Sequence, residues 1–193
     1  MLLSHVKQEY EDVRLSNEEF TKMKTEGKLE FGQVPAVEWD GVMYTQTHAI
    51  LRAIGHNNGL YSTDPITMWK IDSIIDATGD LLSAYYTAAF NPVEETKKEL
   101  LEKFFSVTFP TYLERLENRL KKNSSQKHIV GDNMTIADFV LAGVAYSRFL
   151  NEANPNKATE LAIVEKNPVA LAYFKSLGEE LKEHLEKRKP SAW

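Results

Sequence analysis

The sequence contains no cysteine among its 193 residues. This excludes disulfide bonds, thiolate nucleophiles and metal sites built on cysteine for these residues. If thiol chemistry takes place on this chain, the sulfur must arrive with a ligand. The five histidines are scattered without the spacing of metal ligands, so no metal site is predicted.

Long apolar runs and strong charge of one sign are also lacking. No apolar stretch approaches the roughly 18 residues of a membrane-spanning helix, and the N-terminus does not have the layout of a signal peptide. The 23 basic and 28 acidic residues give a net charge of −5, and no basic cluster is long. This argues against nucleic acid or an anionic membrane as a partner. We therefore expect a cytoplasmic globular protein.

The clearest local pattern is a hairpin followed by a helix. Two short extended runs, residues 36–39 and 42–45, flank Asp40-Gly41, a pair suited to a type I′ turn. Pro35 precedes the first run, where a strand loses no ladder donor. Residues 45–55 then have a polar start, an apolar face and a glycine stop, which predicts a helix.

The order of these pieces resembles the glutathione-binding half of cytosolic glutathione transferases. The matching motifs are Gly32-Gln33-Val34-Pro35, the hairpin, and Gln46-Thr47 at the start of a helix that continues Ala-Ile-Leu-Arg. The sequence is most similar to the sigma-type branch, which includes glutathione-dependent prostaglandin D synthases. The resemblance implies a thioredoxin-like α/β module over residues 1–60 and an all-helical module over residues 66–193.

The remaining residues fit this layout. Residues 9–15 are expected to form a strand, and Ser16 with Glu19 a capping box before a short helix. Helices are predicted at residues 66–90, 93–122, 135–147, 156–164 and 168–186, with a kink at Pro110. Thr135 and Asp138 form a second capping box, which resembles a folding signature of the family and carries no chemistry.

The resemblance also implies a set of glutathione contacts. In the family the proline after Val34 forms a cis peptide bond, which turns the Val34 backbone toward the cysteinyl residue of glutathione; a trans proline is the structural alternative. The helix start would receive the glutamyl carboxylate, and an ordinary helix cap at Thr47 is compatible with this role. The predicted glutathione-binding residues are Lys24, Gln33, Val34, Pro35, Gln46, Thr47 and Asp80.

Two of these contacts involve charge. Lys24 would bind the glycyl carboxylate, with Lys22 as an alternative cation; a solvated surface lysine is the other reading. Asp80 would reach across a homodimer to the α-amino group of glutathione. The alternative for Asp80 is a solvated carboxylate in an acidic row at four-residue spacing.

A small apolar electrophile is the second substrate that the resemblance implies. Aromatic residues could line its pocket, but aromatic residues at helical spacing are more often part of a core. The candidates are Tyr85, Tyr86, Phe90, Tyr146, Phe149 and Trp193.

The catalytic group is expected to be missing. In this branch a tyrosine on the family's first strand holds the thiolate, and Met1-Leu2-Leu3 matches the middle of the helix that follows that strand. No catalytic residue is therefore predicted: either the sequence is an incomplete enzyme, or a partner or rearrangement has repaired the fold. The expected function is conjugation of glutathione, as co-substrate and without metal, to electrophiles, or isomerisation of a peroxide. The alternative is a degenerate structural or interaction subunit.

Overall fold

A computed structural model describes residues 1–189 of the chain. The chain divides into a unit of residues 2–62 and a second unit that begins at Thr63 and also includes Met1.

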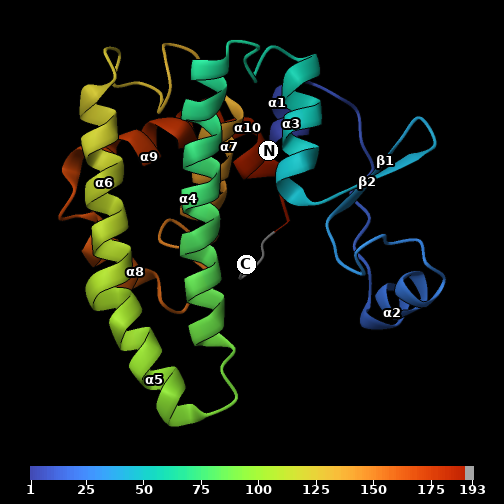
Figure 1. The fold of residues 1–193 in the computed structure, drawn as a ribbon, viewed down its shortest axis with the longest axis horizontal. Helices are drawn as coiled ribbons and strands as arrows, with labels where there is room; N and C mark the ends of the chain where they lie inside the picture. Colours follow the sequence, from blue (N-terminus) through green and yellow to red (C-terminus); the bar gives the residue numbers. More distant parts are fainter. Residues whose placement is uncertain (190–193) are drawn as a thin grey trace. The chain divides into compact units, whose positions relative to one another are not determined.

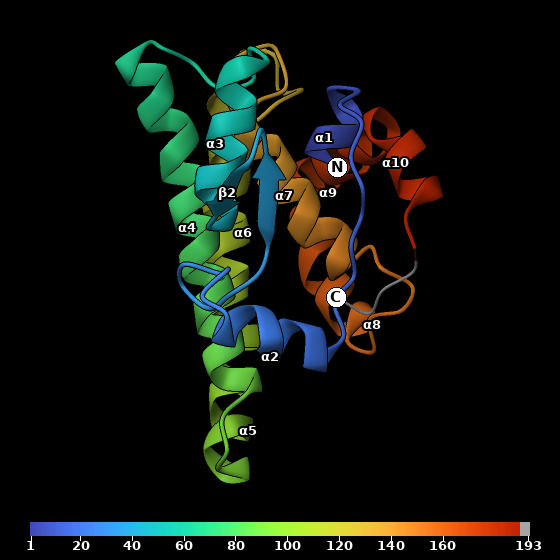
Figure 2. The same cartoon turned by 90° about the vertical axis from the view of Figure 1, so that its right-hand side faces the viewer.

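The first unit contains three helices around a two-stranded antiparallel sheet (Figure 2). Trp39 pairs with Val42 next to the turn, and Asp40 and Gly41 have φ angles of +50° and +74°. Both turn residues are therefore left-handed, as a type I′ turn requires, and the predicted hairpin is confirmed. The elements are α1 (Leu2–His5), α2 (Asn17–Thr25), β1 (Ala36–Trp39), β2 (Val42–Thr45) and α3 (Thr47–Asn57).

The strand predicted over residues 9–15 is wrong. These residues belong to no helix or strand, and Tyr10 and Val13 are 49% and 63% exposed. A strand needs a neighbour for its backbone N–H and C=O groups. In the described part of the chain β1 and β2 pair only with each other. Residues 9–15 therefore have no neighbouring strand with which to form backbone hydrogen bonds.

The α2 helix begins as predicted. The backbone N–H of Ser16 donates to the Glu19 carboxylate at 2.7 Å, and the backbone N–H of Glu19 donates to the Ser16 hydroxyl at 3.2 Å. This reciprocal box satisfies two amides that no helical carbonyl can reach.

The described part of the second unit contains helices and no strand, and its long α4 runs beside α6 (Figure 1). The α7 helix packs between α4 and α9, and α6 also contacts α9. The elements are α4 (Pro65–Ala89), α5 (Glu94–Lys103), the π-helix η1 (Phe104–Thr108), α6 (Phe109–Lys122), α7 (Ile136–Ser147), α8 (Lys157–Val164), α9 (Pro168–Glu180) and α10 (Lys182–Lys187).

The helix predicted over residues 93–122 is present as three consecutive helical segments of different geometry. A π-helical turn, η1, separates α5 from α6 directly before Pro110, and the Phe109 amide bonds to the carbonyl of Phe104. Because proline has no N–H and its ring crowds the preceding turn, a regular α-helix cannot continue through it. The wider π turn accommodates the proline ring and its missing N–H, so the chain continues directly from α5 through η1 into α6.

The α7 helix starts with the predicted capping box. The backbone N–H and the hydroxyl of Thr135 both donate to Asp138, at 2.8 and 3.0 Å. Asp138 is fully buried and also accepts from the Ile129 amide and the Tyr173 hydroxyl. The box therefore connects the preceding loop and α9 to the start of α7.

Candidate functional site

The entry to β1 has the backbone geometry that the family resemblance implies. The Val34–Pro35 peptide bond is cis, so this part of the prediction is confirmed. Val34 is 54% exposed although it is apolar. Gln33 and Pro35 are also exposed. An accessible backbone at Val34 can pair with an extended peptide, the kind of contact that a sheet edge offers. That role remains a prediction.

Lys24 lies beside this segment. It is in the last turn of α2, and a Cβ on Gly32 would lie 3.0 Å from its Cε atom and 3.5 Å from its Cδ and Cγ atoms. Gly32 has a φ of +62°, a left-handed conformation that also favours glycine. The lysine stem thus crosses Gly32, next to Gln33. The alternative cation Lys22 is 4.0 Å from Glu26.

The start of α3 lacks the side-chain cap that α2 and α4 have. Gln46 occupies the capping position with a φ of +68°, and no side chain caps the helix. By contrast, the Asp64 carboxylate accepts from the Thr67 amide at 2.8 Å at the start of α4. Thr47 is the first helical residue and is exposed, so it is not the cap itself. Free amides and the positive end of the dipole make this helix start suited to an anion.

These residues lie on neighbouring segments of one unit. Lys24, Gln33, Val34, Pro35, Gln46 and Thr47 all belong to residues 2–62, whereas Asp80 lies on α4 of the second unit and is exposed. The ammonium of Lys24 and the start of α3 would each favour a carboxylate. The arrangement therefore offers two anion-binding points in the unit that contains the accessible Val34 backbone. The role of Asp80 stays a prediction.

The residues proposed for an apolar pocket divide into two groups. Tyr85 and Phe149 are packed in the core of the helical unit, with exposures of 9% and 1%. Tyr86 and Phe90 are 47% and 73% exposed, and their rings stack with centroids 6.0 Å apart. Trp193 lies outside the described residues. Of these described candidates, Tyr86 and Phe90 therefore present their rings to solvent, whereas Tyr85 and Phe149 belong to the core.

Tyr146, the remaining candidate, points toward α9. Its hydroxyl donates to the carbonyl of Phe174 at 3.3 Å, and Gly178 leaves the space that the ring end occupies. Burial raises the pKa of the Tyr146 hydroxyl. This contact assigns Tyr146 to packing between α7 and α9.

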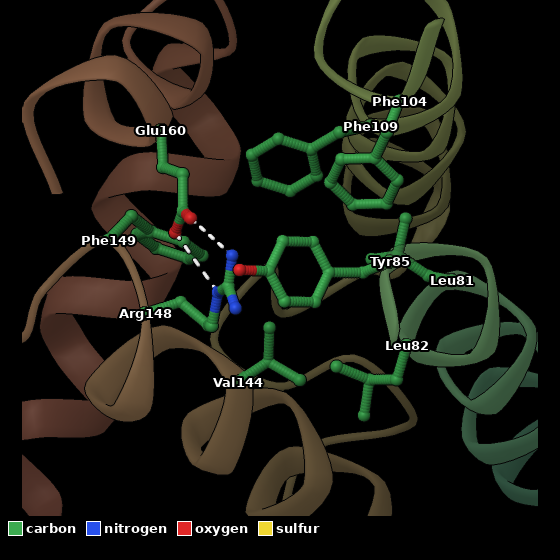
Figure 3. Close-up of a pocket in the computed structure, with 9 residues that line it drawn as sticks. All are labelled: Leu81, Leu82, Tyr85, Phe104, Phe109, Val144, Arg148, Phe149 and Glu160. Atoms are coloured by element: carbon green, nitrogen blue, oxygen red, sulfur yellow. Dashed lines mark hydrogen bonds and ion pairs between the residues drawn. The ribbon is translucent and has the colours of Figure 1, made fainter. Parts of the chain in front are cut away.

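A buried ion pair was not predicted from the sequence. The guanidinium of Arg148 donates to both carboxylate oxygens of Glu160, which is 2% exposed, and lies 3.5 Å from the ring centroid of Tyr85 (Figure 3). Burial raises the pKa of Glu160, although Arg148 and Asn154 oppose this shift. A cavity of about 20 Å³ adjoins the pair, room for about one water molecule, so it does not fit a drug-sized ligand.

Two features are absent from the described residues 1–189. No helix there is long and apolar enough to cross a membrane. No group of three or more His, Asp or Glu side chains in that range is placed to hold a metal ion.

Sequence comparison identifies the helical unit. Residues 79–188, more than half of the chain, match the family model described as glutathione S-transferase, C-terminal domain. The chain belongs to the glutathione S-transferase family. The resemblance drawn from the hairpin and the capping box is thereby confirmed at the level of the family.

Individual relatives agree with this assignment. Glutathione S-transferase S1 of Drosophila melanogaster is 30% identical over 143 residues, which cover 74% of this chain and 56% of that protein. The chain thus matches little more than half the length of this relative. Monomeric Na-GST-3, a glutathione S-transferase of the hookworm Necator americanus, is 28% identical with a TM-score of 0.83, covering 100% of this chain and 91% of that one.

A third comparison supports the fold. Prostaglandin synthase D of Nilaparvata lugens aligns over 97% of this chain and 89% of its own, with 24% identity and a TM-score of 0.83. The predicted fold class, a thioredoxin-like α/β module and a helical module, is confirmed by these neighbours.

Proposed function

We propose that this transferase-family chain binds glutathione through the unit of residues 2–62. The observation that carries the proposal is the uncapped start of α3 next to the strands that follow the cis Val34–Pro35 bond. The glutamyl carboxylate would accept from the free amides at Thr47 and from its hydroxyl. The Val34 backbone would pair with the cysteinyl residue, and Lys24 would bind the glycyl carboxylate.

The reaction we propose is conjugation of the bound thiol to a small apolar electrophile. The thiolate sulfur forms a bond to the electrophilic carbon, the leaving group departs with the bonding electron pair, and the thiol proton passes to solvent. The chain would contribute orientation of the two reactants, which lowers the entropic cost of bringing them together.

Binding can be tested with a series at one position. Thr47→Ser keeps the hydroxyl, Thr47→Ala removes it, and Thr47→Pro removes both the hydroxyl and the backbone N–H. Proline is well tolerated at the first helical residue, so α3 should persist in all three variants. In isothermal titration, Thr47→Ser should bind glutathione about as tightly as the wild type. Thr47→Ala should lose about 1–3 kcal/mol of binding free energy. Thr47→Pro should bind glutathione more weakly than Thr47→Ala.

A matched control is Thr21→Ala, because Thr21 is an exposed threonine of α2 whose hydroxyl bonds only to the Asn17 carbonyl. Its affinity for glutathione should equal that of the wild type. Absence of binding by the wild type at millimolar glutathione would contradict the proposal. It would favour the alternative that the chain is a structural or interaction subunit of this family.

We also propose a cytoplasmic homodimer in which Asp80 faces the glutathione of the partner subunit. The support is the exposure of Asp80 on α4 and its match to the family motif. Sedimentation velocity over a hundredfold range of concentration tests the assembly. A single species with the mass of one chain throughout would contradict it.

A further inference from the structure

Ser16 is an exposed hydroxyl residue that two carboxylates follow closely in the sequence. Six serine or threonine residues of the chain have Asp or Glu three positions later. Four of them lie inside helices, and a fifth, Thr135, donates its hydroxyl to the fully buried Asp138. The four are Ser73, Thr96, Thr111 and Ser176. Of the six residues, Ser16 alone is both exposed and outside a helix.

The chain reaches Ser16 in an extended conformation. Residues 8–16 belong to no helix or strand, and Ser16 itself has φ −69° and ψ 164°. Its hydroxyl oxygen accepts from the Glu19 amide at 3.2 Å, in the capping box of α2. An exposed segment of this conformation can lie in the groove of an enzyme that binds its substrate as an extended peptide.

Carboxylates are frequent on both sides of this serine. Residues 9–19 include five acidic residues and one basic residue, Arg14. That arginine is paired with Asp12 at 2.8 Å, so it does not balance Glu18 and Glu19. Both glutamates are exposed in the first turn of α2. A partner that binds this segment through charge therefore needs a basic surface.

The helix that begins after Ser16 can open at its start at little cost. It has nine residues, none of which is buried. Isolated helices shorter than about 12–15 residues are marginal in water, and segments with few buried contacts open first. Ser176 has the same acidic pattern, but its neighbour Leu177 is fully buried in α9. The surroundings therefore permit access to Ser16 and not to Ser176.

We propose that Ser16 is a phosphorylation site for a protein kinase whose substrate groove is basic. The Ser16 oxygen attacks the γ-phosphorus of ATP, and a new oxygen–phosphorus bond forms. The bond from that phosphorus to the bridging oxygen breaks, and ADP leaves with the electron pair. The hydroxyl proton passes to a carboxylate base of the kinase and then to solvent. This inference is independent of glutathione binding.

The phosphate would replace Glu19 as the cap of α2. It carries a charge of about −1.5 to −2 at pH 7. The Glu19 carboxylate, whose Oε2 atom accepts from the Ser16 amide at 2.7 Å, would be repelled. Hydrogen bonds from Ser16 already lower the pKa of Glu19, so this carboxyl is ionised when the phosphate arrives. The free amides and the positive dipole end of α2 favour the phosphate.

The test incubates the full chain with MgATP and casein kinase II, a kinase that selects acidic substrates, and maps phosphate by tandem mass spectrometry. The wild type should take up one phosphate per chain at Ser16, and Ser16→Ala none. Glu19→Gln removes the charge but retains a side chain able to complete a capping box. It should be phosphorylated roughly tenfold more slowly, as for the loss of one charged contact. In the phosphorylated wild type, the Ser16 amide should exchange faster with solvent, because Glu19 no longer accepts from it.

Two controls separate accessibility from sequence pattern. Thr96→Ala removes the other exposed hydroxyl of the pattern, which is followed by Lys97 and Lys98 in α5, and should be phosphorylated like the wild type. Ser176→Ala should behave in the same way. No phosphate at Ser16, or equal rates for Glu19→Gln and the wild type, would overturn the proposal. Unchanged exchange of the Ser16 amide after phosphorylation would overturn the replacement of Glu19 as the cap.

Discussion

The hydroxyl of Tyr146 occupies the space next to Gly178 that a side chain there would need. A Cβ atom on Gly178 would lie 1.6 Å from that hydroxyl oxygen and 2.5 Å from the ring carbon that carries it. No rotation of a methyl group relieves such a clash, so either the ring or α9 must move. Gly178 is a helical residue in α9, and its lack of a side chain is what lets α7 approach closely.

Gly178→Ala should therefore destabilise the protein, by about 1–3 kcal/mol, because of overpacking. Gly143→Ala is a matched control in α7, since nothing lies within 4 Å of a Cβ built there. That variant should be neutral or more stable by up to about 1 kcal/mol through helix propensity. Urea unfolding followed by circular dichroism measures both, and equal midpoints for the two variants would contradict the Tyr146 contact.

Loss of the buried ion pair should be much more costly than loss of an exposed one. Glu160→Gln leaves the Arg148 guanidinium without its carboxylate in the core, at a cost of about 3–5 kcal/mol. Glu152→Gln breaks the pair with Lys157, in which Glu152 is 89% exposed, and should cost less than about 1 kcal/mol. Thermal unfolding of both variants tests this, and a Glu160→Gln protein as stable as Glu152→Gln would refute it.

The stability that Glu117 contributes should depend on pH. Burial would raise the pKa of this carboxyl, but the Lys121 ammonium and the amides of Val169 and Ala170 outweigh burial and lower it. A lowered folded-state pKa means stabilisation above the ordinary glutamate pKa of about 4.3, lost as pH falls through the folded-state value. Glu117→Gln should thus be less stable than the wild type at pH 7 by about 1–3 kcal/mol.

The difference should narrow below about pH 4, where Glu117 of the wild type becomes protonated as well. Urea midpoints measured between pH 3.5 and pH 7.5 give the profile. Glu114→Gln, at an exposed position of the same helix, should show no such dependence. A constant gap between Glu117→Gln and the wild type across this range would rule out the ionic contribution.

The two residues of the α7 capping box should differ in cost. Thr135→Ala should destabilise by about 0.5–2 kcal/mol, as for other helix caps. Asp138→Ala should cost on the order of 3 kcal/mol, because the Ile129 amide and the Tyr173 hydroxyl also lose their acceptor. Asp132→Ala, at an exposed turn position, serves as the control. Equal costs for Thr135→Ala and Asp138→Ala in guanidinium unfolding would argue against this larger role of Asp138.

Features that depend on a few consecutive residues were predictable from the sequence. The Asp40-Gly41 turn and both capping boxes follow from local backbone chemistry, and the structure contains all three. The cis bond before Pro35 came from the family resemblance, since local preference alone favours trans. Within the candidate site, sequence motifs identified residues but could not show that the start of α3 is uncapped.

Features that depend on residues far apart in the sequence were not predicted, and one physical reason accounts for all of them. The strand predicted over residues 9–15 needed a neighbour that the pattern could not supply. Glu117 bonds to amides 52 and 53 residues away, and Glu30 to a hydroxyl 15 residues away. Such contacts leave no period or spacing in the sequence, because both partners look like ordinary polar residues.

The π-helical turn before Pro110 also determines how residues on its two sides face the bundle. A π turn holds about one residue more than an α turn, and each residue rotates a helix by about 100°. Deleting Val107 would convert the π turn into regular α-helical geometry. It would also rotate α5 by about 100° relative to α6. Phe104, whose ring is stacked 5.9 Å from Phe109, would then no longer face Tyr85. A single-residue gap at this place in an alignment of two relatives therefore indicates a rotation of α5 relative to α6, in addition to a chain that is one residue shorter.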